Sequence, residues 1–305
     1  MYPPAISFII NGSKKASQRI IPDIEKVFAA YPTTIFLTKR VGHATDLANE
    51  AVQSGALFVI SVGGDGTLNE VVNGIMEGCT QMNIDSRSIT LGVLSTGSGN
   101  DFVKSLAKKH TLQSLYEAIQ HSNKTAVDVG KVAFLTIDGQ AAHRYFINIA
   151  DIGIGGVIAE KLSRYQRWLG ANFTYQRAIL STFLSYTPQR LSVRTSTEEI
   201  STPMMSLVVA NARYFGSGLG IAPNALLNDG LLNVIMLKNI TVIDYLRHLP
   251  TIRKCRPIQH PQVSYSTSDF VEVNTQTPLP IDMDGEFVGV TPVVFKVLKE
   301  AISVI

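Results

Sequence analysis

The chain has 305 residues, 45% of them hydrophobic and 17% charged, a balance that is typical of a folded protein and excludes a disordered one. Its length exceeds what a single core usually spans, so we expect two domains. The formal net charge of +3 is too small to indicate nucleic-acid binding. The only cysteines are Cys79 and Cys255, which excludes a disulfide framework and favours a reducing cytoplasm. No run approaches the roughly 18 apolar residues of a membrane span.

The first part of the chain alternates short apolar runs with helical patterns. Apolar runs predict four strands, at residues 6–10, 34–37, 57–62 and 89–94. Apolar positions at a spacing near 3.6 residues predict two helices, at 17–30 and 44–52. Alternating strands and helices favour a parallel sheet with helices on both faces, which is a three-layer α/β domain. Ligands of such sheets bind beyond the carboxyl ends of the strands.

Beyond about residue 126 the pattern changes to successive strand-like segments separated by turn residues. These segments lie at residues 126–135, 145–150, 191–195, 204–210, 231–237 and 271–273. One or two helices are expected within residues 159–186. We therefore predict an α/β domain over residues 1–126 and a β-rich domain over residues 127–292, with the apolar tail 293–305 returning to pack on the first domain.

A glycine-rich turn follows the predicted strand 57–62 and precedes a helical pattern. Its sequence is Gly63-Gly64-Asp65-Gly66-Thr67. Glycines let the backbone approach a ligand closely, so consecutive N–H groups can form an anion-binding concavity at the start of the helix. A carboxylate among phosphates repels them unless a cation lies between. The turn therefore favours a magnesium-bound nucleotide over phosphate alone.

A second turn of the same kind, residues 95–102, follows the predicted strand 89–94. Gly97 and Gly99 leave room for a phosphate or a ribose, and Asn100 and Asp101 can cap the next helix or bond a sugar hydroxyl. The turn is not a dinucleotide fingerprint, because Phe102 stands where the third glycine would fall, and the chain has no P-loop motif. A plain structural turn is the alternative.

Two further segments carry carboxylates near glycine. Asp229 precedes Gly230 just before a predicted strand, which is typical of an ordinary turn or of a cation site that combines a carboxylate with backbone oxygens. The segment 282–286 holds Asp282, Asp284 and Glu286. Such a cluster can supply a metal ligand and a general base, and its alternative is a solvated acidic hairpin tip.

In this order, four of these motifs resemble the diacylglycerol kinase catalytic-domain family, and within it the soluble bacterial lipid kinases. The motifs are Gly63–Ile75, Gly97–Phe102, the stretch Asn211–Val234 and Asp284–Glu286. The resemblance covers nearly the whole chain. It implies a nucleotide domain like that of phosphofructokinases and NAD kinases, followed by a β-sandwich-like domain for the lipid substrate. It also implies transfer of the γ-phosphoryl group of ATP to a hydroxyl of diacylglycerol or a related lipid, in a cleft between the two domains.

Position by position, the resemblance implies three sites. Glu286 matches the proton acceptor, with Asp284 assisting it or binding metal, and Asp65 matches the ligand of the catalytic Mg²⁺. A structural metal would be held by the carbonyls of Leu226 and Leu231 and by the carboxylate of Asp229. The nucleotide would be bound by Asn11, Thr38, Gly63, Gly64, Asp65, Gly66, Thr67, Asn69, Glu70, Gly97, Ser98, Asn100 and Asp101.

The chain departs from the family pattern in two places that bear on these sites. The first loop, Asn11–Lys15, is shortened and lacks the family's proline, which leaves the adenine and ribose contacts open. Asn233 stands where aspartate is common, so a structural metal would depend more on Asp229.

The expected partners are ATP, Mg²⁺ and a membrane-derived lipid. A cytoplasmic protein with peripheral membrane contact is expected to collect that lipid, nucleic acid is not expected, and a homodimer is left open. Two alternatives remain: a soluble-substrate kinase of the NAD kinase type, and a non-catalytic nucleotide-binding module.

Overall fold

The computed structural model describes residues 3–97, 99–106, 110–165 and 181–305. The described chain forms two compact units: the N-terminal unit contains residues 1–129 and 298–305, and the C-terminal unit contains residues 130–297. Two strands, β5 (Thr125–Leu135) and β17 (Glu286–Val304), belong partly to each unit. Each unit is described separately below.

The N-terminal unit is built on a parallel sheet. Its strands are β1 (Ile6–Ile10), β2 (Thr33–Leu37), β3 (Phe58–Gly63) and β4 (Thr90–Ser95). They lie in the order β4-β3-β1-β2, and Ser303 and Val304 at the end of β17 add a parallel partner to β4. Every residue of β1 and β3 is buried, as expected for central strands covered on both faces.

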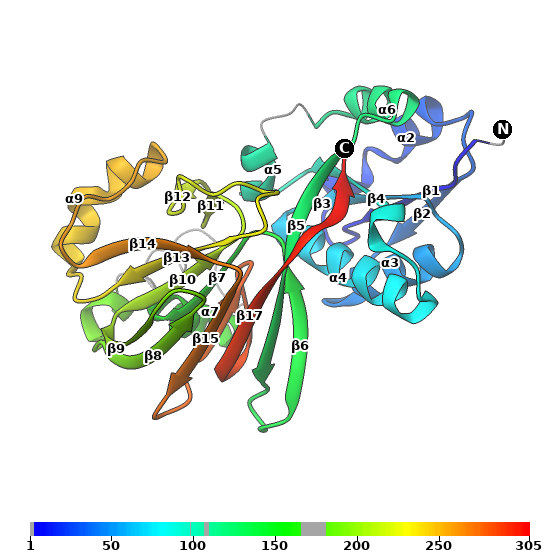
Figure 1. The fold of residues 1–305 in the computed structure, drawn as a ribbon. Helices are drawn as coiled ribbons and strands as arrows, with labels where there is room; N and C mark the ends of the chain where they lie inside the picture. The colour runs from blue at the N-terminus through cyan, green and yellow to red at the C-terminus, as the bar shows by residue number, and fades with distance from the viewer. Residues whose placement is uncertain (1–2, 98, 107–109, 166–180) are drawn as a thin grey trace. The chain divides into compact units, whose positions relative to one another are not determined.

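Helices cover both faces of this sheet (Figure 1). The helices are α1 (Lys15–Gln18), α2 (Ile21–Val27), α3 (His43–Gln53), α4 (Asp65–Met82), α5 (Asp101–Leu106) and α6 (Leu112–His121), with a 3₁₀ turn at Ser86–Ser88. On one face, Phe8 packs edge-to-face on Phe28 of the α2 end at 5.2 Å, and Phe28 packs on Tyr116 of α6 at 5.6 Å. On the other face α3 packs against α4. The predicted three-layer α/β domain is confirmed.

One helix prediction in this unit was wrong. The apolar spacing over residues 17–30 predicted a single helix, whereas the structure divides the segment into α1 and α2. Pro22 lies at the start of α2, where its missing N–H costs no intrahelical hydrogen bond. The proline therefore begins a new helix instead of continuing the first one.

The C-terminal unit is a sandwich of antiparallel strands. Its strands besides β5 and β17 are β6 (Ala141–Phe146), β7 (Ile149–Gly153), β8 (Gln189–Thr195), β9 (Glu199–Met204), β10 (Ser206–Ala210), β11 (Tyr214–Phe215), β12 (Leu219–Gly220), β13 (Leu232–Leu237), β14 (Val263–Ser268), β15 (Phe270–Thr275) and β16 (Pro280–Met283). One layer has the order β14-β13-β10-β7-β16-β17, and the other has β6-β5-β17-β15-β8-β9. The predicted β-sandwich-like fold is confirmed.

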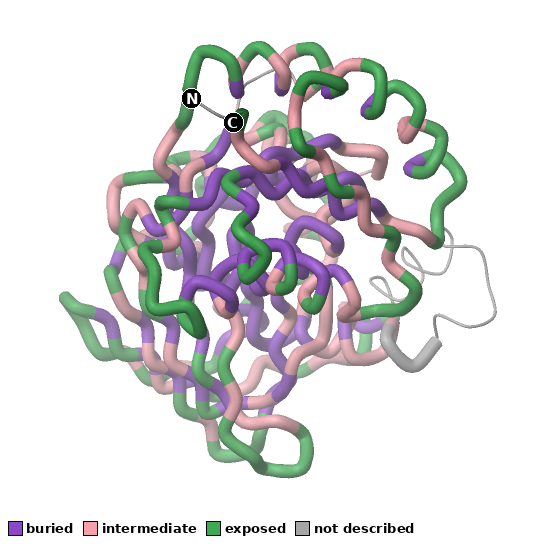
Figure 2. The backbone as a smooth tube through the Cα atoms, turned by 90° about the vertical axis from the view of Figure 1, so that its right-hand side faces the viewer, coloured by how far each residue is buried: buried purple, intermediate pink, exposed green. Residues whose placement is uncertain are grey.

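The core of the sandwich consists of inward-facing side chains from both layers, including Phe146, Leu207, Val234 and Phe295. Burying each large apolar side chain stabilises the fold by roughly 1.5–3 kcal/mol. Figure 2 shows the strands largely buried in purple, with exposed green segments at the surface. The sequence predicted one strand at 145–150, but the structure ends β6 at Phe146 and begins β7 at Ile149, because the chain turns at residues 147 and 148.

Two helices pack on the outer face of the layer that contains β10 and β13. They are α7 (Ile154–Tyr165) and α9 (Val242–Arg253), and residues 181–185 are also helical. A second apolar cluster, which includes Val208, Ile235, Ile252 and Ile258, joins α9 to this face. The segment 166–180, where the sequence also predicted helix, lies outside the described residues.

Candidate active site

The first glycine turn joins β3 to α4. Gly64 has extended backbone angles and precedes Asp65, the first residue of the 18-residue helix α4. The second glycine turn lies against it, because a Cβ added to Gly97 would lie 2.8 Å from the Cα of Gly64. Thr96 N–H also donates to Gly63 O at 2.8 Å. The two turns therefore form one surface at the start of α4, where free backbone N–H groups favour an anion.

The first loop is held against the same surface. Asn11 Nδ2 donates to Thr67 Oγ1 at 3.0 Å, and Gly12 N–H donates to Thr38 Oγ1 at 3.1 Å. A Cβ at Gly12 would lie 2.2 Å from the carbonyl oxygen of Thr38, so this close approach needs glycine. The structure thus brings together Asn11, Thr38 and Thr67, which the sequence placed in the nucleotide site.

Asp65 links the two glycine turns through its carboxylate. Its Oδ1 accepts hydrogen bonds from Asp101 N–H at 2.9 Å and from Phe102 N–H at 3.4 Å. Burial raises the pKa of Asp65, and the neighbouring charge of Asp101 raises it further, while the hydrogen bonds from the backbone lower it. A bound cation would favour the ionised form of this carboxylate.

Lys14 is a residue of this site that the sequence analysis did not select. Its Nζ lies 3.9 Å from the position that a Cβ on Gly64 would occupy. A lysine beside a glycine turn provides a point charge for a phosphate. The signal was present in the sequence, because Lys14 lies in a polar loop directly after a buried strand.

Two of the expected nucleotide-binding residues have structural partners. The buried carboxylate of Glu70 accepts hydrogen bonds from Gly42 N–H at 2.8 Å and from Ala44 N–H at 2.9 Å, and it thereby caps α3. Asn69 is also buried, and its Oδ1 accepts a hydrogen bond from Asn73 Nδ2 at 3.2 Å. Nucleotide contacts by these two residues stay predictions. Ser98 lies outside the described residues.

The acidic segment of the C-terminal unit is a two-residue hairpin turn. Asp284 and Gly285 both have positive φ, and Met283 pairs with Glu286 across the turn between β16 and β17. The Asp284 carboxylate accepts hydrogen bonds from three consecutive N–H groups, those of Ile147, Asn148 and Ile149, at 2.8–3.2 Å. Asp284 therefore anchors the hairpin to the start of β7.

Glu286 lies directly after this anchored turn. Its Oε2 is 3.5 Å from Nη2 of Arg144 on β6, and both side chains are partly exposed. The ion pair restrains the Glu286 carboxylate from one side, and Asp284 fixes the backbone that carries it. The structure thus places the two predicted residues side by side. The Asp284 carboxylate holds the turn through backbone hydrogen bonds, whereas the Glu286 carboxylate pairs with Arg144.

Asp229 closes a turn in the C-terminal unit. Its Oδ1 accepts a hydrogen bond from Leu231 N–H at 3.0 Å, and Gly230 has positive φ. The residues that the structure describes contain no group of three or more His, Cys, Asp or Glu side chains that could hold a metal ion. The structural metal site at Leu226, Asp229 and Leu231 stays a prediction.

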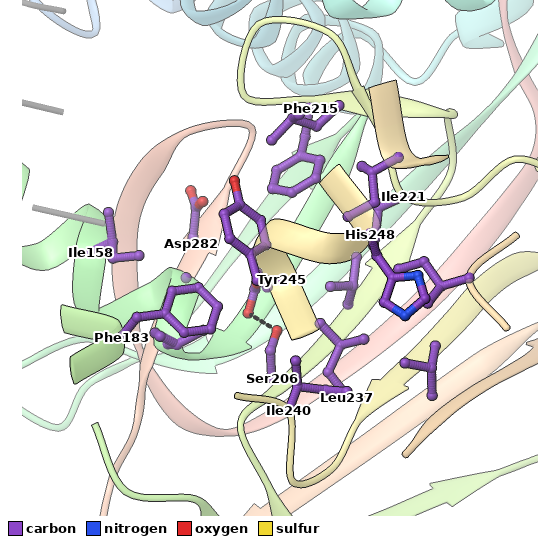
Figure 3. A pocket seen from close by; sticks show the side chains of 18 of the residues that line it. Ile158, Phe183, Ser206, Phe215, Ile221, Leu237, Ile240, Tyr245, His248 and Asp282 are labelled. Carbon is purple, nitrogen blue, oxygen red and sulfur yellow. Dashed lines mark hydrogen bonds between the residues drawn. The ribbon is translucent and has the colours of Figure 1, made fainter. Parts of the chain in front are cut away.

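An apolar pocket lies in the C-terminal unit between α7, α9 and the outer face of the sheet (Figure 3). It has about 1110 Å³ of atom-free space, part of which is open to solvent. Phe183 and Tyr245 stack at 5.2 Å along one wall. The described lining residues include Ile158, Leu162, Val208, Phe215, Ile221, Leu237 and Ile252, and no lysine or arginine.

Two carboxyl groups, those of Asp151 and Asp282, also line this pocket. They face each other across the strands β7 and β16. Asp151 accepts a hydrogen bond from Ser206 Oγ at 2.7 Å, drawn in Figure 3, and another from Gly155 N–H in the first turn of α7. The Oδ1 of Asp282 is buried and has no hydrogen-bond partner among the described residues.

Both carboxyl groups hold their protons more tightly than exposed ones. Burial raises the pKa of Asp151 to about 7, although the hydrogen bonds from Ser206 and Gly155 oppose the shift. Burial also raises the pKa of Asp282 well above its ordinary value, and the charges of Asp151, Asp284 and Glu286 raise it further. The sequence carried one overlooked signal, since an aspartate in the apolar run Ile149–Ile152 is unusual.

Comparison with known proteins agrees with the fold of the two units. The model described as the diacylglycerol kinase catalytic domain matches residues 5–132, and the model described as the YegS C-terminal NAD kinase beta sandwich-like domain matches residues 148–305. The second match alone spans just over half of the chain. No helix among the described residues is long and apolar enough to cross a membrane.

Individual relatives cover nearly all of the chain. A protein of Bacillus subtilis named diacylglycerol kinase is 28% identical and covers 96% of this chain and 91% of its own length. A protein of Staphylococcus epidermidis with the same name is 29% identical, and the match covers 96% of this chain and 89% of that protein. A crystal structure from Bacillus anthracis, provisionally named diacylglycerol kinase, shares the fold with a TM-score of 0.75 at 21% identity. The match covers 99% of this chain and 96% of that one. The chain therefore belongs to the diacylglycerol kinase family, and within it to the lipid kinases that carry a β-sandwich-like C-terminal domain.

Proposed function

We propose that the protein transfers the γ-phosphoryl group of ATP to the hydroxyl of an uncharged membrane lipid, such as diacylglycerol. The observation that carries this proposal is the pocket of the C-terminal unit, whose described lining is apolar except for a few polar groups that include Asp151 and Asp282 and no lysine or arginine. Apolar walls suit acyl chains. The described lining offers no lysine or arginine to bind an anionic head group. Burial raises the pKa of Asp151 and Asp282 and thus favours their uncharged form, in which a carboxyl group can donate a hydrogen bond to a neutral polar head group.

The N-terminal unit supplies the groups that the nucleotide requires. The close approach of Gly64 and Gly97 brings the two turns together beside the start of α4, where a phosphate would bind, and Lys14 adds a positive charge there. Asp65 is the residue of this surface that would hold Mg²⁺, since its carboxylate lies at the junction of the two turns. Magnesium, when bound with ATP, neutralises charge on the transferred phosphoryl group. Phosphoryl transfer needs positioning and charge neutralisation more than covalent chemistry.

Glu286 is the proposed proton acceptor for the lipid hydroxyl. The anchored Asp284-Gly285 turn fixes its backbone, and Arg144 restrains its carboxylate at 3.5 Å. A general base must lie within hydrogen-bond reach of the proton that it removes. The mechanism therefore requires the two units to bring the terminal phosphate and Glu286 to the same hydroxyl, and this step is part of the proposal.

The test is a kinase assay with labelled ATP and diacylglycerol in mixed micelles. Glu286→Gln keeps the size of the side chain and removes its basicity, so we expect kcat to fall by roughly 10²–10⁴-fold with the KM for ATP little changed. The matched control is Glu272→Gln, which removes another glutamate of this unit that pairs with an arginine, Arg194 on β8, and should leave kcat unchanged.

Other outcomes of this assay would favour a different function. Unchanged kcat in Glu286→Gln would remove this residue from the mechanism. Conversion of NAD to NADP without lipid phosphorylation would support a soluble-substrate kinase. Tight ATP binding with no turnover on any acceptor would support a nucleotide-binding module.

A further inference from the structure

The outward face of α9 carries apolar and basic side chains at helical spacing. Ile243 is 76% exposed and Leu246 is 56% exposed, and Pro250 lies exposed one further turn along. Residues three and four positions apart lie on the same side of a helix, so these three form one stripe. Arg247 and Lys254 are exposed along the edge of the same stripe. A soluble helix normally presents polar side chains on its outer face.

The opposite face of the same helix lines the apolar pocket. Tyr245, His248 and Ile252 face the pocket, and Ile252 is buried in the cluster that joins α9 to the sheet. Figure 1 shows α9 on the side of this unit next to β13 and β14. The helix is therefore a wall of the pocket on one side and an exposed apolar stripe on the other.

The charge around α9 is strongly one-sided. Residues 238–268 contain five lysines and arginines, namely Lys238, Arg247, Arg253, Lys254 and Arg256, and a single acidic residue, Asp244. Asp244 is not part of the outward stripe, because its Oδ2 accepts hydrogen bonds from the N–H and Oγ1 of Thr241 at the start of α9, and its Oδ1 lies 3.6 Å from His260 Nε2. The outward face is thus apolar and basic without a competing carboxylate.

We propose that α9 docks on the surface of a bilayer that contains anionic lipids. Ile243 and Leu246 insert among the acyl chains near the head groups, and the basic side chains contact anionic head groups. This assignment rests on the proposed function, because it explains how a pocket for a lipid reaches its substrate. The anionic lipid contacts the outer face of the helix, whereas the uncharged substrate enters the pocket behind it.

The experiment is vesicle sedimentation of the full chain. The vesicles contain either equal parts of phosphatidylglycerol and phosphatidylcholine or phosphatidylcholine alone. We expect the wild type to pellet with the anionic vesicles, to pellet much less with the zwitterionic ones, and to be released by high salt. The double variant I243S/L246S should lose at least about tenfold in partitioning, since two exposed apolar side chains no longer insert.

The matched control is Ile137→Ser. Ile137 is 71% exposed in the turn between β5 and β6, so it tests whether any exposed isoleucine of this unit contributes. This variant should pellet like the wild type. Phosphorylation of a short-chain diacylglycerol dissolved as monomers should be unchanged in I243S/L246S, which shows that the fold and the site are intact.

Three results would overturn the inference. The first is vesicle binding by I243S/L246S equal to that of the wild type. The second is a change of that variant from dimer to monomer in light scattering with its vesicle binding retained, which would assign the stripe to a second copy of the chain. If the double variant fails to fold, R247Q/K254Q takes its place. The third result is then binding of R247Q/K254Q to the anionic vesicles equal to that of the wild type. A different result would contradict only the proposed function: the protein binds vesicles as predicted but phosphorylates none of the lipids tested.

Discussion

The buried carboxyl pair of the C-terminal unit leads to a quantitative prediction about stability and pH. Asp151 has a pKa of about 7 in the folded protein against an ordinary value of 3.8, and the cause is burial. The folded state therefore keeps a proton that the unfolded chain releases at a lower pH. Stability from this group is fully present below about pH 4 and is lost as pH rises to about 7.

The shift of about three pKa units corresponds to roughly 4 kcal/mol of unfolding free energy, at about 1.4 kcal/mol per unit. The variant Asp151→Asn cannot ionise, yet its side chain keeps an oxygen that can accept the hydrogen bonds from Ser206 and Gly155. Removing the Asp151 charge also lowers the pKa of Asp282, because that charge contributes to raising it. Both effects flatten the dependence of stability on pH.

The assay is urea unfolding of the wild type and of Asp151→Asn at several pH values from about pH 4 to about pH 8. Circular dichroism monitors the loss of secondary structure, and each curve gives a free energy of unfolding. The control is Asp138→Asn, since Asp138 is exposed and its pKa is lowered through hydrogen bonds with Thr136 and its own backbone. We expect the free energy of unfolding of the wild type to fall toward pH 8 more than that of Asp151→Asn. Between about pH 4 and about pH 8, the difference between the two proteins should change by up to about 4 kcal/mol in favour of the variant. Parallel profiles for wild type and Asp151→Asn, or equal flattening in Asp138→Asn, would refute the reasoning.

Three further predictions concern caps and turns of the two units. Glu70→Ala leaves two N–H groups of the α3 start without their acceptor and should lower stability by about 2–4 kcal/mol in chemical unfolding, with Glu70→Gln losing less. Asp284→Ala should release the hairpin and reduce kcat at least about tenfold by displacing Glu286, while ATP affinity in calorimetry stays unchanged. Gly97→Ala should lower the melting temperature and weaken ATP binding, since its Cβ meets backbone at 2.8 Å, whereas Gly64→Ala, with its nearest neighbour at 3.6 Å, should melt close to the wild type.

Local sequence patterns were sufficient for most of the elements of the N-terminal unit. Residues 6–10 are a strand in both the prediction and the structure, because a short apolar run between polar loops has few other solutions. The pattern failed where one residue overrides periodicity: Pro22 divided the predicted helix 17–30. It also failed at residues 145–150, where the turn at Asn148 is fixed by Asp284, more than 130 residues away in the chain.

The same limit applies to the candidate site. Glycine turns, Asp284 and Glu286 could be found from short motifs, since those motifs depend on neighbouring residues. The partners of these residues could not, because Arg144 meets Glu286 only through the pairing of distant strands. The cap that Glu70 provides to α3 and the apposition of Asp151 and Asp282 likewise depend on tertiary contacts. Sequence motifs thus indicate candidate functional groups, and the fold decides what surrounds them.

The selectivity of the proposed phosphoryl transfer between lipids tests the central claim most directly. Purified protein, labelled ATP and Mg²⁺ are incubated with one mixed micelle that contains diacylglycerol and phosphatidylglycerol in equal amounts, and the products are separated and identified by mass spectrometry. The pocket has mostly apolar walls, no lysine or arginine among its described lining residues, and two carboxyl groups whose raised pKa values favour the uncharged form. We therefore expect the label to enter diacylglycerol, the uncharged lipid, and not the anionic one. Preferential phosphorylation of phosphatidylglycerol, or no labelled lipid at all, would contradict the account.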